Sequence, residues 1–291
     1  MTALSEFDHA ILLVDELDAA ERDVVALGFR PTPRGVHGSG LGTANATVMM
    51  PDGRTYFEVL GVVDPNPRNA DKQAKLARRG RHLYGLALKG DARQAAELFG
   101  TAGIGAGDAF DFARDVDLPS GPAEARFTIA QTKADSLPGV WLFVCQQHTP
   151  DVVWRPDYLD HPNGARSVTA LIGSAGDRAT LAEAWAPLLD DRMHRADDAI
   201  RLDLGGTAIV FADPALLADR FGVASPGDAS SGDDPALFIV AVEVASLGET
   251  RRALEVGGVP HHATAAGDLL AETRAALGAD FLFTERPDAW A

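Results

Sequence analysis

The stretch that decides the fold is FDHAILLVDELDAAERDVVALGF, residues 7–29. Its first eight residues are almost all apolar, which is typical of a buried strand. Acidic residues follow, and then a helical pattern that ends at Gly28. Side-chain oxygens at this spacing accept hydrogen bonds from the free N–H groups of a first helical turn, so we expect a helix to begin near Asp15. A histidine, His9, lies inside the apolar run, and its presence there needs a physical reason.

The same order of signals occurs four times along the chain. Each copy has an apolar run, a helix-start signature, a helix and further short apolar runs that predict strands. The later copies open with LYGLALKG (83–90), SVTALIG (167–173) and LFIVAVEVAS (237–246). This period is too long for a solenoid. The pattern predicts an α+β fold of four βαβββ modules, paired into two cupped mixed sheets that each have one face covered by helices.

The segment TPDVVWRPDYLDHPNGARS (149–167) separates the two halves of the chain and is rich in proline and glycine. Such composition is typical of a domain boundary. We therefore expect an N-terminal domain over residues 1–150, a linker over 151–165 and a C-terminal domain with a degenerate cup over 166–291. The sequence leaves open whether each cup forms within one chain or across a homodimer.

The composition excludes several classes of partner. The net charge is −16 and the pI about 4.8, so the chain lacks the basic surface that nucleic acid binding requires. No apolar stretch reaches the roughly 20 residues of a membrane span, and the first residues do not form a signal peptide. There is a single cysteine, Cys145, so no intrachain disulfide can form. We expect a cytoplasmic protein whose partner is a small molecule.

Paired βαβββ modules with a histidine on a first strand and a glutamate on a last strand resemble the vicinal oxygen chelate superfamily. Two stretches are similar to glyoxalase-like domain proteins within it: TPRGVHGSGLGTANATVMMPDGRTYFEVLG (32–61) and VCQQHTPDVVWRPDYLDHPNGA (144–165). The resemblance covers nearly the whole chain and is weakest after about residue 210. It implies divalent-metal chemistry on a small metabolite with adjacent oxygens, of the lyase, isomerase or dioxygenase type, although some members bind small molecules without metal.

In this superfamily the first and last strands of each module supply the metal ligands. The resemblance gives His9 and Glu58 these positions in the first copy, and Zn, Fe, Mn, Ni and Co all accept imidazole and carboxylate ligands. Taken singly, each residue also suits a purely structural role. A carboxylate within TYFEVLG is nevertheless costly unless it is paired, hydrogen-bonded or bound to metal. Strand alternation puts His9 on the face of Phe7 and Ile11, away from Asp8.

Aligning the copies shows how the ligand pattern changes along the chain. In the second copy, Gly85 takes the place of His9 and Val144 the place of Glu58. In the last two copies the corresponding positions are apolar or weakly polar: Val168 or Thr169, Val210 and Phe283. The second cup is therefore predicted to be a scaffold without ligands.

A third metal ligand must come from elsewhere in the first cup. We expect it to be Gln146, on the same strand face as the position assigned to Val144. His37, in the glycine-rich stretch VHGSGLGTAN, and His148 are rivals, and His82 is a weaker one. If the protein is an enzyme, His37 or Glu58 is the expected proton-transfer group beside the metal.

Further side chains are expected to bind the substrate or close the pocket. They are Asn45, Tyr56, Trp154, Arg155, His161 and Asn163. The segment from Trp154 to Asn163 suits an interdomain clasp equally well. The competing hypothesis is a metal-free cup that sequesters a small molecule, as bleomycin-resistance proteins do, and the absence of charged groups at Gly85 and Val144 favours it.

Overall fold

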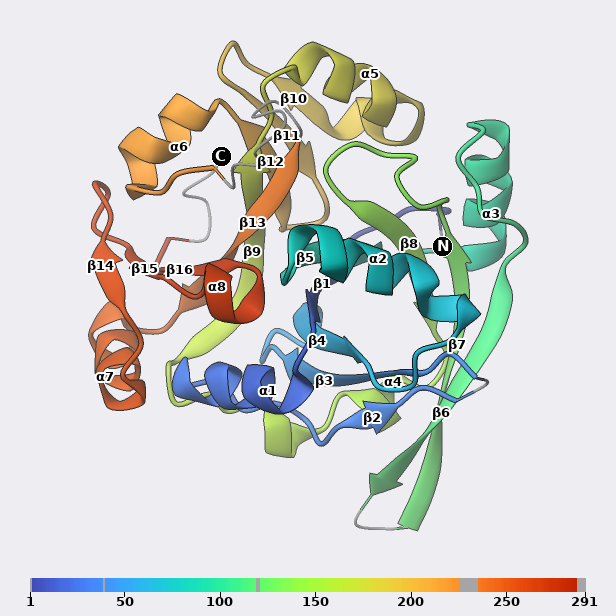
Figure 1. The fold of residues 1–291 in the computed structure, drawn as a ribbon, viewed down its shortest axis with the longest axis horizontal. Coiled ribbons are helices and arrows are strands. Elements are labelled where there is room, and N and C mark those ends of the chain that lie inside the picture. Colours follow the sequence, from blue (N-terminus) through green and yellow to red (C-terminus); the bar gives the residue numbers. More distant parts are fainter. Residues whose placement is uncertain (1, 39, 119–120, 226–234, 287–291) are drawn as a thin grey trace.

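The computed structural model describes residues 2–38, 40–118, 121–225 and 235–286. Four βαβββ modules follow one another along the chain (Figure 1). The first consists of β1 (Phe7–Val14), α1 (Leu17–Ala26), β2 (Gly35–Val36), β3 (Thr43–Met49) and β4 (Tyr56–Val62). The second consists of β5 (His82–Leu88), α3 (Ala92–Thr101), β6 (Phe110–Leu118), β7 (Gly121–Gln131) and β8 (Trp141–Gln147). Between them lie η1 (Pro67–Asn69) and α2 (Ala70–Arg79).

A short helical segment connects the two pairs of modules, with α4 (Pro150–Val153) and η2 (Pro156–Tyr158). The third module consists of β9 (Ala165–Ser174), α5 (Arg178–Leu189), η3 (Asp190–Arg192), β10 (Met193–Arg195), β11 (Ala199–Asp203) and β12 (Ala208–Ala212). The helix α6 (Pro214–Phe221) follows it. The fourth consists of β13 (Ala236–Val244), α7 (Leu247–Gly257), β14 (His261–Ala263), β15 (Leu269–Ala271), α8 (Arg274–Leu277) and β16 (Asp280–Thr284).

The modules pair into two eight-stranded mixed sheets. The strand orders are β2-β3-β4-β1-β5-β8-β7-β6 and β10-β11-β12-β9-β13-β16-β15-β14. In each sheet the first strands of two modules run antiparallel at the centre, and each pairs in parallel with the last strand of its own module. The predicted α+β fold of four βαβββ modules is therefore confirmed. Among the described residues, no helix is long and apolar enough to cross a bilayer.

The helix starts follow the capping signals in three of the four modules. Asp91, Asp177 and Ser246 each accept a hydrogen bond from a backbone N–H of the first turn of α3, α5 and α7. The prediction for α1 was wrong, because Glu16 is its N-cap and makes no side-chain cap. Asp15 instead pairs with Arg81 from the next module, and this ion pair holds the pKa of Asp15 below its usual range.

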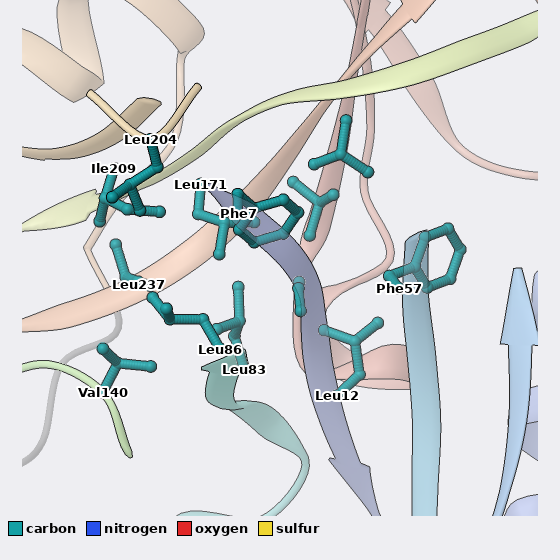
Figure 2. Close-up of a cluster of buried hydrophobic side chains, with 14 of the residues drawn as sticks. Phe7, Leu12, Phe57, Leu83, Leu86, Val140, Leu171, Leu204, Ile209 and Leu237 are labelled. Carbon is teal, nitrogen blue, oxygen red and sulfur yellow. The ribbon is translucent and has the colours of Figure 1, made fainter. Parts of the chain in front are cut away.

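One buried hydrophobic cluster joins the two sheets. It contains side chains from the helix-bearing faces of both sheets, and Figure 2 shows Phe7, Phe57 and Leu171 within it. The backbone N–H of Phe7 also donates to the carbonyl of Leu204, at 3.0 Å. The two halves thus share one core, and their independence as domains stays a prediction. Because the core takes one face of the first sheet, the other face is left to line a cavity.

Candidate functional site

The first sheet curls around a cavity of about 230 Å³. Strands β1, β3, β4, β6, β7 and β8 line it, and η1 and α2 contribute Arg68, Asn69 and Lys72. In Figure 1, α2 lies across the strands of this sheet. The cavity contains four of the sequence-predicted residues from the first module together with an imidazole from the glycine-rich stretch: His9, Asn45, Tyr56, Glu58 and His37.

His9 is held in place by a neighbouring carboxylate. Its Nδ1 lies 2.8 Å from Oδ2 of Asp8, and the two side chains are 4% and 0% exposed. Asp8 also accepts from the side-chain amide of Gln147, at 3.1 and 3.2 Å. A carboxylate accepts only, so the ring donates from Nδ1; in a neutral ring this tautomer leaves the lone pair on Nε2. Among the described residues, no hydrogen-bond partner lies at Nε2.

The prediction that Phe7 lies on the same face of β1 as His9 and Ile11 was wrong. A register shift separates Phe7 from His9 in the pairing of β1 with β5. Phe7 packs in the shared core, whereas Ile11 belongs to the cluster beneath the cavity. A bulge of this kind breaks the strict alternation of faces. The irregularity lets Asp8 reach the ring of His9 instead of pointing away from it.

Glu58 lies one strand over from His9 on the same cavity. In the parallel pairing of β1 with β4, His9 is opposite Tyr56 and Ile11 is opposite Glu58. Two residues of strand rise and one interstrand step separate the two Cα atoms by roughly 8 Å. The carboxylate is 7% exposed and accepts a short hydrogen bond from Nδ2 of Asn45 on β3. The two side chains therefore line one cavity, as expected, and joint metal binding stays a prediction.

Aromatic rings fix the orientation of the His9 imidazole. Tyr56 stacks on it with ring centroids 4.3 Å apart, and Phe143 meets it edge-on at 5.3 Å. Burial raises the pKa of Tyr56 well above its usual range, so the phenol stays neutral at physiological pH. Such packing restricts the ring to one orientation.

His37 lies at the cavity from the segment that the sequence placed over the cup mouth. Its Nδ1 is 2.8 Å from Oγ1 of Thr43, and its ring meets Phe112 edge-on at 5.5 Å. Burial lowers the pKa of His37, while the negative charge of Glu58 acts in the opposite direction. We therefore expect a neutral imidazole at pH 7. Its role in proton transfer stays a prediction.

The second module supplies an apolar wall, and its register differs from the prediction by one residue. Gly85 pairs with Trp141, just as His9 pairs with Tyr56, so the position equivalent to Glu58 is Phe143 and not Val144. Val144 packs in the shared core. A Cβ at Gly85 would lie 2.9 Å from the ring of Trp141, so the indole occupies the room that the missing side chain leaves. This part of the cavity is therefore an apolar wall and not open space.

The same one-residue slip displaces Gln146. Its side-chain oxygen accepts from the backbone N–H of Ala92 at the start of α3, on the helix-bearing side of the sheet. The prediction that it faces the cavity was wrong, because adjacent strand residues point to opposite faces. Two of the three rivals also lie elsewhere: His148 bonds to Thr128 at 2.7 Å, and His82 bonds to the Gly80 carbonyl at 2.8 Å. The third, His37, lines the cavity.

The linker side chains contact the protein away from the cavity. His161 accepts from the N–H of Arg30 through Nδ1 and donates to the Met49 carbonyl through Nε2, at 3.1 and 3.0 Å. Asn163 donates to the Leu27 carbonyl at 2.9 Å and accepts from the N–H of Ala165. These bonds tie the linker to the first module, as the clasp hypothesis expects.

The two remaining linker residues likewise lie outside the cavity lining. Trp154 meets Tyr56 edge-on at 5.8 Å, behind the ring that stacks on His9. Arg155 pairs with Asp157 at 3.1 Å. Neither residue lines the cavity, so their predicted contact with a substrate finds no support in this geometry.

Three cationic side chains line the cavity, and the sequence predictions missed them. They are Arg68 from η1, Lys72 from α2 and Arg114 from β6. Burial lowers the pKa of Lys72, while the nearby carboxylate of Asp71 acts in the opposite direction. The sequence does indicate the helix that carries Lys72. The stretch ADKQAKLARR (70–79) consists of residues that favour a helix, and it follows an Asn-Pro helix start.

The second cup is filled. A separate hydrophobic cluster covers its inner face and includes Leu217 and Phe221 from α6. Val210 pairs with Ile172 as Glu58 pairs with Ile11, so Val210 takes the position of Glu58, as predicted. The position of His9 is taken by Ala170, and not by Val168 or Thr169 as predicted. In the fourth module, Phe283 packs in the shared core and not on the cup face.

A divalent metal fits these residues only in part. An imidazole that donates from Nδ1 to a carboxylate is typical of a metal ligand, so His9 with Asp8 suits this role. Glu58 would be a second donor, and catalytic zinc sites have about three protein ligands. The described part of the chain contains no group of three His, Cys, Asp or Glu side chains that could hold a metal ion. His9 and Glu58 would therefore hold a metal only with further donors from outside this set.

Comparisons with known proteins agree with this architecture. The family model described as a glyoxalase-like domain matches residues 7–189. A 4-hydroxymandelate synthase mutant from Streptomyces coelicolor is 15% identical, with a TM-score of 0.58 over 96% of this chain and 92% of that one. The Mn(II)-bound glyoxalase from Novosphingobium aromaticivorans is 13% identical, with a TM-score of 0.53 over 97% of this chain and 82% of that one. At such identities the likeness concerns the fold alone. Comparison with curated proteins gives no match.

Proposed function

Because the chain belongs to the glyoxalase-like domain family, we propose that it is an enzyme that moves a proton on a small metabolite with adjacent oxygens. The observation that carries this proposal is the Asp8–His9 pair, whose imidazole lines the cavity while the carboxylate holds its Nδ1. A positioned imidazole of this kind contributes about 10²–10⁴-fold as a general base. The reaction class is a lyase or isomerase step next to a carbonyl group.

The chemistry of such a step needs no group beyond the side chains of the cavity. Nε2 of His9 takes a proton from the carbon beside the carbonyl, and the electron pair of that C–H bond moves to the carbonyl oxygen. Asp8 stabilises the imidazolium that forms, as a carboxylate behind a catalytic histidine does. His9 then returns the proton to the adjacent carbon. Glu58 or His37 would take the proton of the neighbouring hydroxyl and pass it to the former carbonyl oxygen, so that each side chain ends in its starting protonation state.

Binding without turnover is the second candidate function. Its support is the apolar wall, because Phe143 replaces the second glutamate position and Trp141 fills the space beside Gly85. Such a wall would hold a ligand with little chemistry of its own. In this case His9 would only donate or accept a hydrogen bond.

Solvent exchange at carbon separates the two functions. The full-length protein, treated with chelator, is incubated in D₂O with a panel of α-hydroxy ketones and 2-hydroxy aldehydes, and deuterium at the carbon beside the carbonyl is followed by NMR. We expect catalysed exchange for at least one compound and a loss of about 10²–10⁴-fold in His9→Gln. His148→Gln is the matched control, because that ring bonds to Thr128 outside the cavity. Binding with no exchange would favour the second function.

A further inference from the structure

The cavity has the opposite charge to the molecule that contains it. The whole chain has 42 acidic and 26 basic residues, for a net charge of −16. Among the described residues that line the cavity, three are cationic and a single one, Glu58, is a carboxylate. Charges of one sign inside a cleft with low-dielectric walls concentrate ligands of the other sign. The cavity is thus locally positive, although the net charge of the whole molecule repels anions.

Lys72 is the first of the cations that point to an anionic ligand. Its ammonium lies 5.4 Å from the ring centroids of both Tyr84 and Trp141, and its side chain is 18% exposed. Its carboxylate neighbour Asp71 is 3.7 Å away, and that carboxylate also accepts from the hydroxyl of Tyr84 at 2.9 Å. The ammonium of Lys72 is largely desolvated and only loosely paired, so a second negative charge beside it would stabilise it.

Arg114 is the second of these cations. It comes from β6, and a Cβ at Gly35 of β2 would lie 3.0 Å from its Nη1 and 3.1 Å from Oδ1 of Asn45. The lack of a side chain at position 35 therefore makes room for the guanidinium close to the Asn45–Glu58 pair. Among the described residues, no carboxylate forms an ion pair with Arg114. A planar guanidinium binds a carboxylate with two parallel hydrogen bonds.

Beyond these cations the lining is largely aromatic, and the cavity is small. Trp141 and Phe143 stack with centroids 4.7 Å apart, and Phe112 and Phe127 lie 5.9 Å from each other on the next strands. Its volume of about 230 Å³ lies just below the roughly 300–1,000 Å³ of typical ligand pockets. A cavity of this size suits a small molecule with a ring or short branched chain and one small head group.

We propose that the ligand of this site is a small amphipathic anion, in which a carboxylate is bound by Lys72 and Arg114 and an apolar body packs on Trp141 and Phe143. This inference rests on the proposed function in that both concern the same cavity, and it names the class of substrate. His9 and Glu58 would then face the carbon atoms between the head group and the body.

Calorimetric titration of the full-length, chelator-treated protein tests the proposal with three probes of one shape. They are 3-phenylpropanoate, its neutral amide and 2-phenylethyl phosphate. We expect the carboxylate to bind at least about tenfold more tightly than the amide, with an affinity that falls as salt rises. Equal affinity of acid and amide, or no binding of any probe, would overturn the proposal. Tighter binding of the phosphate would support an anion site and identify the head group as a phosphate.

Two variants locate the anion. Lys72→Met and Arg114→Met should each reduce the preference for acid over amide by about tenfold, with unchanged melting temperature. Lys75→Met is the matched control on the same helix, because Lys75 pairs with Asp135 at 2.7 Å outside this cavity. A preference that survives both substitutions refutes the assignment. Since binding needs no turnover, a protein with this preference and no solvent exchange would refute the proposed function alone.

Discussion

Replacing Asp8 by asparagine should change the protonation of His9 and leave the fold intact. The carboxylate is fully buried and accepts from Nδ1 of His9 at 2.8 Å and from the amide of Gln147 at 3.1 and 3.2 Å. The introduced side chain keeps one oxygen for Gln147 but presents an NH₂ group to Nδ1. The imidazole must then carry its proton on Nε2, so it loses the lone pair that reaches the cavity.

The cost to stability follows from the hydrogen bonds that change. A hydrogen bond to a charged group contributes about 1.5–3 kcal/mol and a neutral one about 0.5–1.5 kcal/mol, so Asp8→Asn should lower the free energy of unfolding by roughly 1–2 kcal/mol. Asp8→Ala leaves the donors of His9 and Gln147 without a partner. At about 1–3 kcal/mol for each unsatisfied group, it should cost roughly 2–6 kcal/mol. Urea unfolding of both variants measures the difference.

Ring nitrogen NMR decides whether the reasoning holds. Two-bond ¹H–¹⁵N spectra show which imidazole nitrogen is protonated, and we expect Nδ1–H for His9 in the wild type and Nε2–H in Asp8→Asn. Solvent exchange by the variant should fall by about 10²–10⁴-fold. Asp280→Asn is the control, because that buried carboxylate pairs with Arg274 in the fourth module and not with His9. A wild-type protein with Nε2–H at His9 would refute the assignment of the base.

Three further outcomes follow from single features of the structure. Burial lowers the pKa of His161, so the unfolded chain binds a proton that the folded chain does not. The free energy of unfolding should therefore fall as the pH drops below about 6.5, by at most about 1.4 kcal/mol per pH unit. In urea titrations from pH 7.5 to 5.5, the free energy of unfolding of His161→Gln should depend less on pH than that of the wild type, and an equal dependence would contradict this. Equilibrium dialysis with Zn²⁺ should give less than one tightly bound ion per chain, and a stoichiometric ion that His9→Ala removes would restore the metal-dependent mechanism. Gly139 has a φ of +92°, and a Cβ there would lie 2.5 Å from the Phe211 ring. Gly139→Ala should therefore lower the free energy of unfolding by about 1–3 kcal/mol in thermal or urea unfolding. Unchanged stability would show that the backbone at Gly139 and the Phe211 ring adjust without cost.

The fold could be predicted because its signals are local and repeated. An apolar run, a helix start and a helix recur in each module, and Asp91, Asp177 and Ser246 cap the helices as expected. Each repetition is an independent sample of the same pattern, so an error in one module, such as the cap of α1, does not change the architecture.

The site was harder to predict because it depends on register. The apolar pattern predicted the strands that carry His9 and Glu58. Counting from glycines in turns, however, chose Val144 and Gln146, each one residue beyond a cavity-facing position, Phe143 and Cys145. Turns of different length shift such a count, and a shift of one residue exchanges the two faces of a strand. The contact of Asp8 with His9 depends on a strand irregularity that no periodicity indicates.

The two modules of the first sheet have divided the lining of the cavity between them. The first supplies His9 and Glu58, the groups proposed to move a proton. The second has Gly85 and Phe143 at the equivalent positions, with the Trp141 indole in the space beside Gly85. In a cup with ligands from both modules, polar groups would converge at the centre. Here one wall carries ionisable side chains and the other is apolar. We therefore expect a bound molecule to lie in one orientation. The cations added by α2 and β6, which belong to neither pair of equivalent positions, then determine which of its ends is charged.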